Sequence, residues 1–229
     1  DIDGEAAGDY SGRSVSLSKD GTIVAIGGFG NDGNGSNSGH TRIYQYANDS
    51  WTQLGSDIDG EAAGDYSGRS VSLSDDGTIV AIGAYGNDDG GTSDYQWRNL
   101  NAGQTRIYQY ASNSWSQLGS DIDGEAAGDY SGYSVDLSDD GTIVAIGAYQ
   151  NDGNGSSSGH TRIYQYASNS WSQLGNDIDG ESADDLSGVS VSLSDDGTII
   201  AIGAHGNDDG GTSTIGNRNP NHSLAHIHA

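Results

Sequence analysis

The stretch that decides the fold is DIDGEAAGDYSGYSVDLSDDGTIVAIGA, which occupies residues 121–148. Nearly the same text begins at Asp1, Asp57 and Asp177, so that successive copies start 56, 64 and 56 residues apart. Such self-similarity is the signature of repeat architectures, in which each unit buries its apolar surface against its neighbours. We therefore interpret residues 1–229 as a single repeat domain. Its four units span residues 1–56, 57–120, 121–176 and 177–229.

Each unit contains short segments with the patterns expected of strands. In the first unit, residues 14–18 alternate small polar with apolar side chains, which indicates a strand with one buried face. Residues 22–27 are apolar on both faces, so that strand must be covered on both sides. The Asp-Gly pair between these two segments is typical of a hairpin turn. Residues 41–46 and 51–54 predict a third and a fourth strand.

Four antiparallel strands joined by tight turns form a sheet that cannot cover both of its faces alone. Stacking such sheets around an axis is the solution found in β-propellers, whose blades typically have four strands. The sequence therefore predicts an all-β propeller of four antiparallel blades, each of 56 to 64 residues.

The last unit departs from the repeat. Residues 214–229 form a divergent tail, which keeps at most a third strand, so we expect the last blade to be incomplete. An unpaired strand edge invites pairing with another segment. We expect this open edge to be closed either by the N-terminal segment or by a neighbouring copy in a fibre or ring.

The charge of the chain disfavours some classes of partner. There are 33 acidic and 8 basic residues, which give a formal net charge of −25. Nucleic-acid phosphates and anionic membrane surfaces require a basic patch, so we expect no nucleic-acid binding. We also expect no membrane insertion, because no apolar run approaches the roughly 18 residues of a membrane span. Cysteine is absent, and methionine is absent even at position 1, so we expect a processed product or a fragment.

Three stretches of the first unit resemble the FG-GAP repeat: GDYSGRSV at residues 8–15, VAIG at 24–27 and GHTRIY at 39–44. The resemblance extends over all four units. It implies a β-propeller similar to the one at the head of integrin α subunits. It also implies an extracellular or cell-surface location, and adhesion or ligand binding rather than catalysis.

The chain departs from the FG-GAP pattern in two places. The Phe that gives the family its name is replaced by Ser in every unit, and the Pro is replaced by an aromatic residue or His. The family's calcium loop between the first and second strands is shortened here to residues 18–21 and their copies. That turn is too short to wrap a cation, so the family's calcium sites do not carry over.

Acidic segments at the start of the units are a different candidate for calcium. In residues 57–65, carboxylates stand at relative positions 1, 3, 5 and 9, a spacing that oxygen-rich loops use for a hard cation. The candidate ligands are Asp57, Asp59, Glu61 and Asp65 in the second unit, and Asp121, Asp123, Glu125 and Asp129 in the third. The alternative is that these residues form turns and cap backbone amides, as Asp and Gly commonly do.

Aromatic residues and histidines supply further candidates. Regular strand positions favour packing between blades or at blade edges over sugar stacking for Tyr44, Tyr46, Trp51 and their copies. Trp97 and Tyr95 lie in the loop inserted into the second unit, where no repeated packing role explains them, and we predict that they contact a ligand or partner.

Two sets of histidines complete the candidates. His222, His226 and His228 allow a zinc site, although we favour a flexible tail, and His40 and His160 read as isolated loop residues.

The sequence contains no catalytic constellation. There is no nucleophile elbow, phosphate loop or zinc-protease motif, and the carboxylates recur in every unit, whereas enzyme sites on pseudosymmetric folds usually need residues that break the symmetry. We therefore expect no enzyme. The expected function is an extracellular structural or adhesive propeller that associates with itself through an open blade edge into a larger assembly or filament. An extracellular protein or glycan is a further possible partner. The alternative is a lectin-like or calcium-dependent ligand-binding module.

Overall fold

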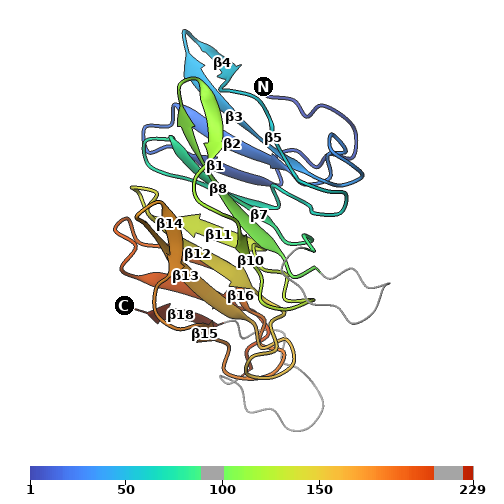
Figure 1. The fold of residues 1–229 in the computed structure, drawn as a ribbon, viewed down its shortest axis with the longest axis vertical. Helices are drawn as coiled ribbons and strands as arrows, with labels where there is room; N and C mark the ends of the chain where they lie inside the picture. Colours follow the sequence, from blue (N-terminus) through green and yellow to red (C-terminus); the bar gives the residue numbers. More distant parts are fainter. Residues whose placement is uncertain (89–100, 209–223, 229) are drawn as a thin grey trace.

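The computed structural model describes residues 1–88, 101–208 and 224–228. All regular elements in these residues are β-strands, and they form four successive antiparallel sheets (Figure 1). The sheets follow one another in chain order along the long axis of the molecule. Since the described residues contain no helix, they contain none that could cross a membrane. The prediction of an all-β protein built from propeller blades is confirmed.

The first sheet contains four strands in sequence order, close to the predicted bounds. They are β1 (Ser14–Leu17), β2 (Ile23–Gly28), β3 (His40–Ala47) and β4 (Ser50–Gln53). The turn between β1 and β2 is closed by the Asp20 carboxylate, which accepts hydrogen bonds from the Ser18 hydroxyl and from the backbone amide of Thr22. The next residue, Gly21, has a φ of 71°, a conformation that favours glycine.

The second and third sheets repeat this arrangement. The second contains β6 (Ser70–Leu73), β7 (Ile79–Ala84), β8 (Gln104–Ala111) and β9 (Ser114–Gln117). The third contains β11 (Ser134–Leu137), β12 (Ile143–Ala148), β13 (His160–Ala167) and β14 (Ser170–Gln173). Strands in corresponding positions have matching lengths, as expected of a repeated unit.

The fourth sheet has three strands within the part of the chain that the structure describes, as the divergent tail indicated. They are β16 (Ser187–Leu193), β17 (Ile200–Ala204) and β18 (Leu224–His228). The prediction that the N-terminal segment of the same chain closes the open edge of this sheet is wrong. The carbonyl oxygen of Asp3 instead accepts a hydrogen bond from Arg42 in the first sheet, at 2.7 Å.

Three two-residue strands were not expected from the sequence. They are β5 (Ile58–Asp59), β10 (Ile122–Asp123) and β15 (Ile178–Asp179). Each opens one unit but pairs with the third strand of the preceding sheet; for example, Asp59 lies opposite His40 and Ile58 opposite Thr41. Two residues are too few to produce a periodic signal, so the sequence assigned these segments to a loop. We call them connector strands.

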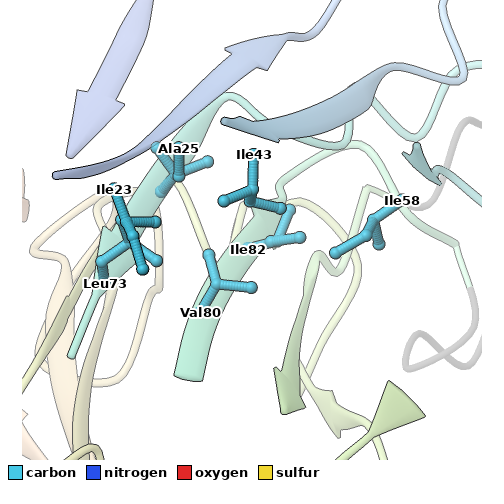
Figure 2. Packing of buried hydrophobic residues seen from close by; sticks show 8 residues of the cluster. Ile23, Ala25, Ile43, Ile58, Leu73, Val80 and Ile82 are labelled. Atoms are coloured by element: carbon cyan, nitrogen blue, oxygen red, sulfur yellow. The ribbon is translucent and has the colours of Figure 1, made fainter. Parts of the chain in front are cut away.

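Neighbouring sheets share apolar cores. Figure 2 shows Ile23, Ala25 and Ile43 of the first sheet facing Val80 and Ile82 of the second. The side chains of Ala25, Ile43 and Val80 are fully buried. Corresponding clusters lie between the second and third sheets and between the third and fourth. The prediction that neighbours cover both faces of an inner sheet is confirmed.

Polar contacts between the turns also join the sheets. The backbone amide of Lys19 donates to the carbonyl of Asp75, the amide of Asp75 to Asp139, and the amide of Asp139 to Asp195. The Lys19 ammonium bonds to the carboxylates of Asp75 and Asp139, and these bonds raise its pKa above the usual lysine range. The turns thus form a chain of bonds that runs across all four sheets.

The difference in burial between Leu73 and Leu17 tests this packing. They occupy the same position in neighbouring units, with 7% and 58% of their surface exposed. We expect Leu73→Ala to lower the free energy of unfolding by about 2 to 5 kcal/mol, as is usual for a buried leucine. In dilute protein, Leu17→Ala should cost less than about 1 kcal/mol, because that side chain already meets water. Urea denaturation followed by tryptophan fluorescence measures both values, and equal losses would contradict the packing between sheets.

Candidate functional site

The first sheet exposes an apolar face that the inner sheets bury. Val15 and Leu17 of β1 are 62% and 58% exposed, whereas their counterparts in the second and third sheets are 7% to 8% exposed. Val24 and Ile26 lie directly opposite them on β2 and are only partly buried. We call these four residues the leading face. It is half of an inter-sheet core that has no second half within the described residues.

The fourth sheet exposes the complementary half, which we call the trailing face. Ile199 is 44% exposed, whereas its counterparts Ile23 and Ile79 are 8% and 9% exposed. Ala201 is partly exposed, although the equivalent alanine in each of the other three sheets is fully buried. The trailing face, Ile199 and Ala201, therefore corresponds to the residues that pack against the next sheet in every earlier unit.

A buried histidine and three carboxylates form what we call the first pocket: Glu5, His40, Asp57 and Asp59. His40 is the first residue of β3 and is 1% exposed. Its Nδ1 lies 3.8 Å from Glu5 Oε2 and 3.7 Å from Asp57 Oδ2. Neither ring nitrogen has a hydrogen-bond partner among the described residues. Asp59 reaches this place because its connector strand pairs with β3. Its pKa is raised by burial and by the charge of Asp57.

The third unit repeats the arrangement in what we call the second pocket: Glu125, His160, Asp177 and Asp179. His160 Nδ1 lies 3.9 Å from the Asp177 carboxylate and 4.0 Å from those of Glu125 and Asp179. Burial, assisted by the nearby charge of Arg162, lowers the pKa of His160 from 6.5 to about 4. At neutral pH the imidazole is therefore uncharged and has a lone pair available.

The second unit has a glutamine in the same place. Gln104 begins β8, is 1% exposed, and donates from Nε2 to the Asp123 carboxylate at 3.3 Å. Its Oε1 has no hydrogen-bond partner in the described parts of the chain. The first and third units thus place an imidazole among carboxylates, whereas the second places an amide beside Asp123.

The predicted calcium ligands of the second unit are divided among several partners. Asp57 and Asp59 belong to the first pocket. Glu61 lies 3.4 Å from the guanidinium of Arg106. Asp65 is buried and accepts hydrogen bonds from two backbone amides of its own loop, at 2.9 and 3.0 Å. The loop therefore does not direct these four carboxylates toward one point.

The predicted ligands of the third unit are divided in the same way. Asp121 accepts a hydrogen bond from a glutamine of β9, and Asp123 accepts one from the glutamine that begins β8. Glu125 lies in the second pocket, and Asp129 accepts hydrogen bonds from Asn151 and from a backbone amide. Calcium binding by these eight residues stays a prediction.

The shortened turns between the first and second strands use their carboxylates internally. In the second sheet, Asp76 accepts bonds from the Ser74 hydroxyl and from both the backbone amide and hydroxyl of Thr78. The same pattern occurs in the other three sheets. These carboxylates are therefore held by hydrogen bonds within their own turns, and the absence of the family's calcium sites stays a prediction.

Some of the repeated aromatic residues pack between sheets, as predicted, whereas Tyr46 is 43% exposed and packs against Trp51 of its own sheet. Trp115 and Tyr108 lie against the first core cluster, and the Trp115 indole donates to the carbonyl of Leu54 at 2.7 Å. Trp97 and Tyr95 lie outside the described residues, so their predicted contact role stays a prediction. His222 also lies outside them, and only the strand backbone is described for His226 and His228.

Sequence reasoning missed the two pockets. His40 was read as an isolated loop residue because its carboxylate partners come from the start of its own unit and from the next unit. The available signal was the recurrence of histidine at residues 40 and 160, with glutamine at the equivalent position 104.

An open groove of about 730 Å³ runs along the first strand of each sheet: β1, β6, β11 and β16. Its polar lining includes Arg13, Arg69, Tyr133 and His205. The guanidinium of Arg69 lies 4.1 Å from the centre of the Tyr133 ring, a cation–π contact. The groove therefore combines cationic and aromatic side chains in a chain that is otherwise strongly acidic.

Acid should destabilise the wild type more than a His160→Gln variant. The folded pKa of His160, about 4, lies below the unfolded value of 6.5, so the unfolded chain binds its proton first. The uncharged His160 therefore contributes to the free energy of unfolding in full above pH 6.5, and this contribution is lost as the pH falls toward 4. Between about pH 7 and pH 5, the unfolding free energy of the wild type should fall by about 2 kcal/mol more than that of the variant. Urea titrations in chelator measure the difference, and equal falls would contradict it.

Solved structures similar to this chain include propellers. The β-propeller domain of Myceliophteria thermophila Cps50 (Swd1) is 10% identical, with a TM-score of 0.52, over 88% of this chain and 50% of that one. Kuenenia stuttgartiensis hydrazine synthase is also 10% identical, with a TM-score of 0.50, over 88% of this chain and 43% of that one. This chain thus spans about half the length of these structures. The likeness concerns the fold alone.

Comparison with curated protein sequences found no match. The model of the family described as the FG-GAP repeat matches residues 3–44, 57–95 and 121–164. These matches begin near the starts of the first three units and together cover more than half of the sequence. The chain therefore belongs to the FG-GAP repeat family.

Proposed function

We propose that this protein is a structural, adhesive propeller unit that associates head to tail with further copies of itself. The observation that carries the proposal is the exposure of Val15 and Leu17 at positions that are buried in the second and third sheets. Burying one such side chain contributes about 1.5 to 3 kcal/mol. A second copy that covers the leading face would recover this free energy.

The two end faces are complementary in shape at one specific point. Within the chain, Ile23 fills the space beside Gly77, and Ile79 fills the space beside Gly141. The equivalent space beside Gly21 in the first sheet has no neighbour within 4 Å among the described residues. The exposed Ile199 of another copy is the residue that the repeat would bring to Gly21.

Polar groups at the two ends also match. Inside the chain, the Ser14 and Ser134 hydroxyls donate to carbonyls of the following sheet, both at 2.8 Å. Ser190 is the equivalent residue at the trailing end, where the next sheet would belong to another copy. Gly12 in the first unit offers the equivalent carbonyl. Docking by the repeat's own geometry therefore pairs polar groups as well as apolar ones.

The geometry of such a contact sets the form of the assembly. The two surfaces differ, so the contact is heterologous, and it gives a ring if the rotation closes or a filament if it does not. Each copy carries a formal charge of −25, and this repulsion is screened by salt. We therefore propose a salt-favoured assembly outside the cell, a location that the family resemblance supports, with a binding or structural role rather than catalysis.

Leu17→Asp should abolish association by placing a charge in the leading face, and Ile199→Asp should do the same at the trailing face. Mixing these two variants should restore a dimer, because each retains the face that the other has lost. Thr52→Asp is the matched control, because it adds a charge at an exposed position on β4 and should associate like the wild type. Sedimentation velocity at about 0.15 M salt, near physiological ionic strength, measures the wild type, the three variants and the mixture.

Two outcomes would overturn the head-to-tail contact. One is a wild type that stays monomeric at high concentration and high salt. The other is a mixture of the two variants that stays monomeric, because a head-to-tail contact would join the intact trailing face of one variant to the intact leading face of the other.

The open groove supports a second candidate, a lectin-like module that binds glycans against the part of the groove lined by Tyr133 and Arg69. Aromatic rings with adjacent cationic donors suit sugar rings and their acidic substituents. In that case, Tyr133→Ala should remove binding on a glycan array, whereas Tyr46→Ala, on the outer strands, should keep it. An array without any bound glycan would exclude this candidate.

A further inference from the structure

We propose that each of the two histidine pockets binds one divalent transition-metal ion of the zinc class, with the imidazole and carboxylates as ligands. The strongest observation is His40, which is 1% exposed and has two ring nitrogens without hydrogen-bond partners among the described residues. Buried polar groups are nearly always paired, because leaving one unpaired costs about 1 to 3 kcal/mol. A metal ion bound to Nδ1 would satisfy the nitrogen that faces the carboxylates.

The distances between the donor atoms are close to those between the ligands of a zinc ion. Ligand atoms of His40, Asp57 and Asp59 lie within 4.8 Å of one another, and so do those of Glu125, His160 and Asp177. Zinc bonds of about 2.0 to 2.2 Å in a tetrahedron place neighbouring ligand atoms about 3.4 Å apart. The His40 Nδ1 distances of 3.7 and 3.8 Å to the Asp57 and Glu5 carboxylates therefore need to shorten by only a few tenths of an ångström.

The mixture of donors selects the class of metal. Calcium and magnesium take oxygen ligands, whereas one imidazole nitrogen with carboxylate oxygens suits zinc and its neighbours. Copper and nickel also bind such sites, because the affinity of nitrogen and oxygen ligands for divalent metals rises along the first transition row up to copper. We choose zinc as the probe for this class of metal.

The proposed metal binding does not depend on the proposed head-to-tail association.

Neighbouring groups hold the carboxylates in place. In the first pocket, Gln53 donates to the Asp57 oxygen that does not face the imidazole, and Arg42 lies 3.7 Å from the second oxygen of Glu5. In the second pocket, Gln173 donates to Asp177 in the same way, at 2.6 Å. Such outer contacts orient metal ligands and commonly change affinity by about 10- to 100-fold.

The second unit supplies an internal control. Gln104 replaces the histidine there, and it occupies the Asp123 carboxylate with its own amide. We therefore expect two sites per chain rather than three. His40→Gln and His160→Gln copy a side chain that the fold already accepts at this position, so the variants should fold. Gln104→His should create a third site.

Isothermal titration of chelator-stripped full-length chain with zinc chloride tests the proposal. The double variant His40→Gln/His160→Gln is the baseline, since it keeps the C-terminal histidines and all the carboxylates. We expect the wild type to bind two more ions than this baseline, each single variant one more, and Gln104→His three more. Zinc should raise the melting temperature of the wild type more than that of the baseline.

The outcomes separate the proposal from calcium binding and from adventitious zinc. Equal zinc stoichiometry in the wild type and the double variant would overturn it, because the ions would then lie elsewhere. A parallel titration with calcium chloride should show no difference between these two proteins. A calcium stoichiometry that falls with the histidines would overturn the assignment to the zinc class.

Discussion

The structure depends on one constraint: a strand such as β7 is apolar on both faces, and its sheet is too thin to cover either face. Val80 and Ile82 point to the preceding sheet, and Ala81 points to the following one. The free energy of the fold therefore lies mainly between units rather than within them, as is general for repeat proteins. An inner sheet is stable because it has two neighbours, whereas the first and fourth sheets each have one neighbouring sheet within the described residues.

This constraint makes the two ends of the array chemically special. The contacts that join one unit to the next are copied along the chain, from the glycine space filled by isoleucine to the serine hydroxyl that meets a carbonyl. A copied contact leaves one unused half at each end, and the two halves are complementary by construction. The surface on which we base the proposed self-association therefore follows from repetition itself and needs no specialised residues.

The sequence predicted the strands well because each has a local cause. The alternation in residues 14–18 and the Asp-Gly turn after it determine β1 and β2 without reference to the rest of the chain. The connector strands and the pockets have no such local cause. His40 meets Asp59 only because a two-residue strand of the next unit pairs with β3, and Glu5 reaches it from the start of the first unit. Local sequence patterns therefore do not predict that these residues, which are distant in the sequence, lie close together.

The short loops of the first and third units explain why the pockets occur in alternate units. Asn34 donates to the carbonyls of Gly60 and Glu61, directly after connector strand β5, which contains Asp59 and follows Asp57. Asn154 makes the equivalent bonds in the third unit. Each loop thus fixes the carboxylates of the following unit against the histidine of its own. The second unit has a longer loop and a glutamine in place of the histidine. Loop and imidazole therefore change together, as expected if they serve one site and the pair of units is what was duplicated.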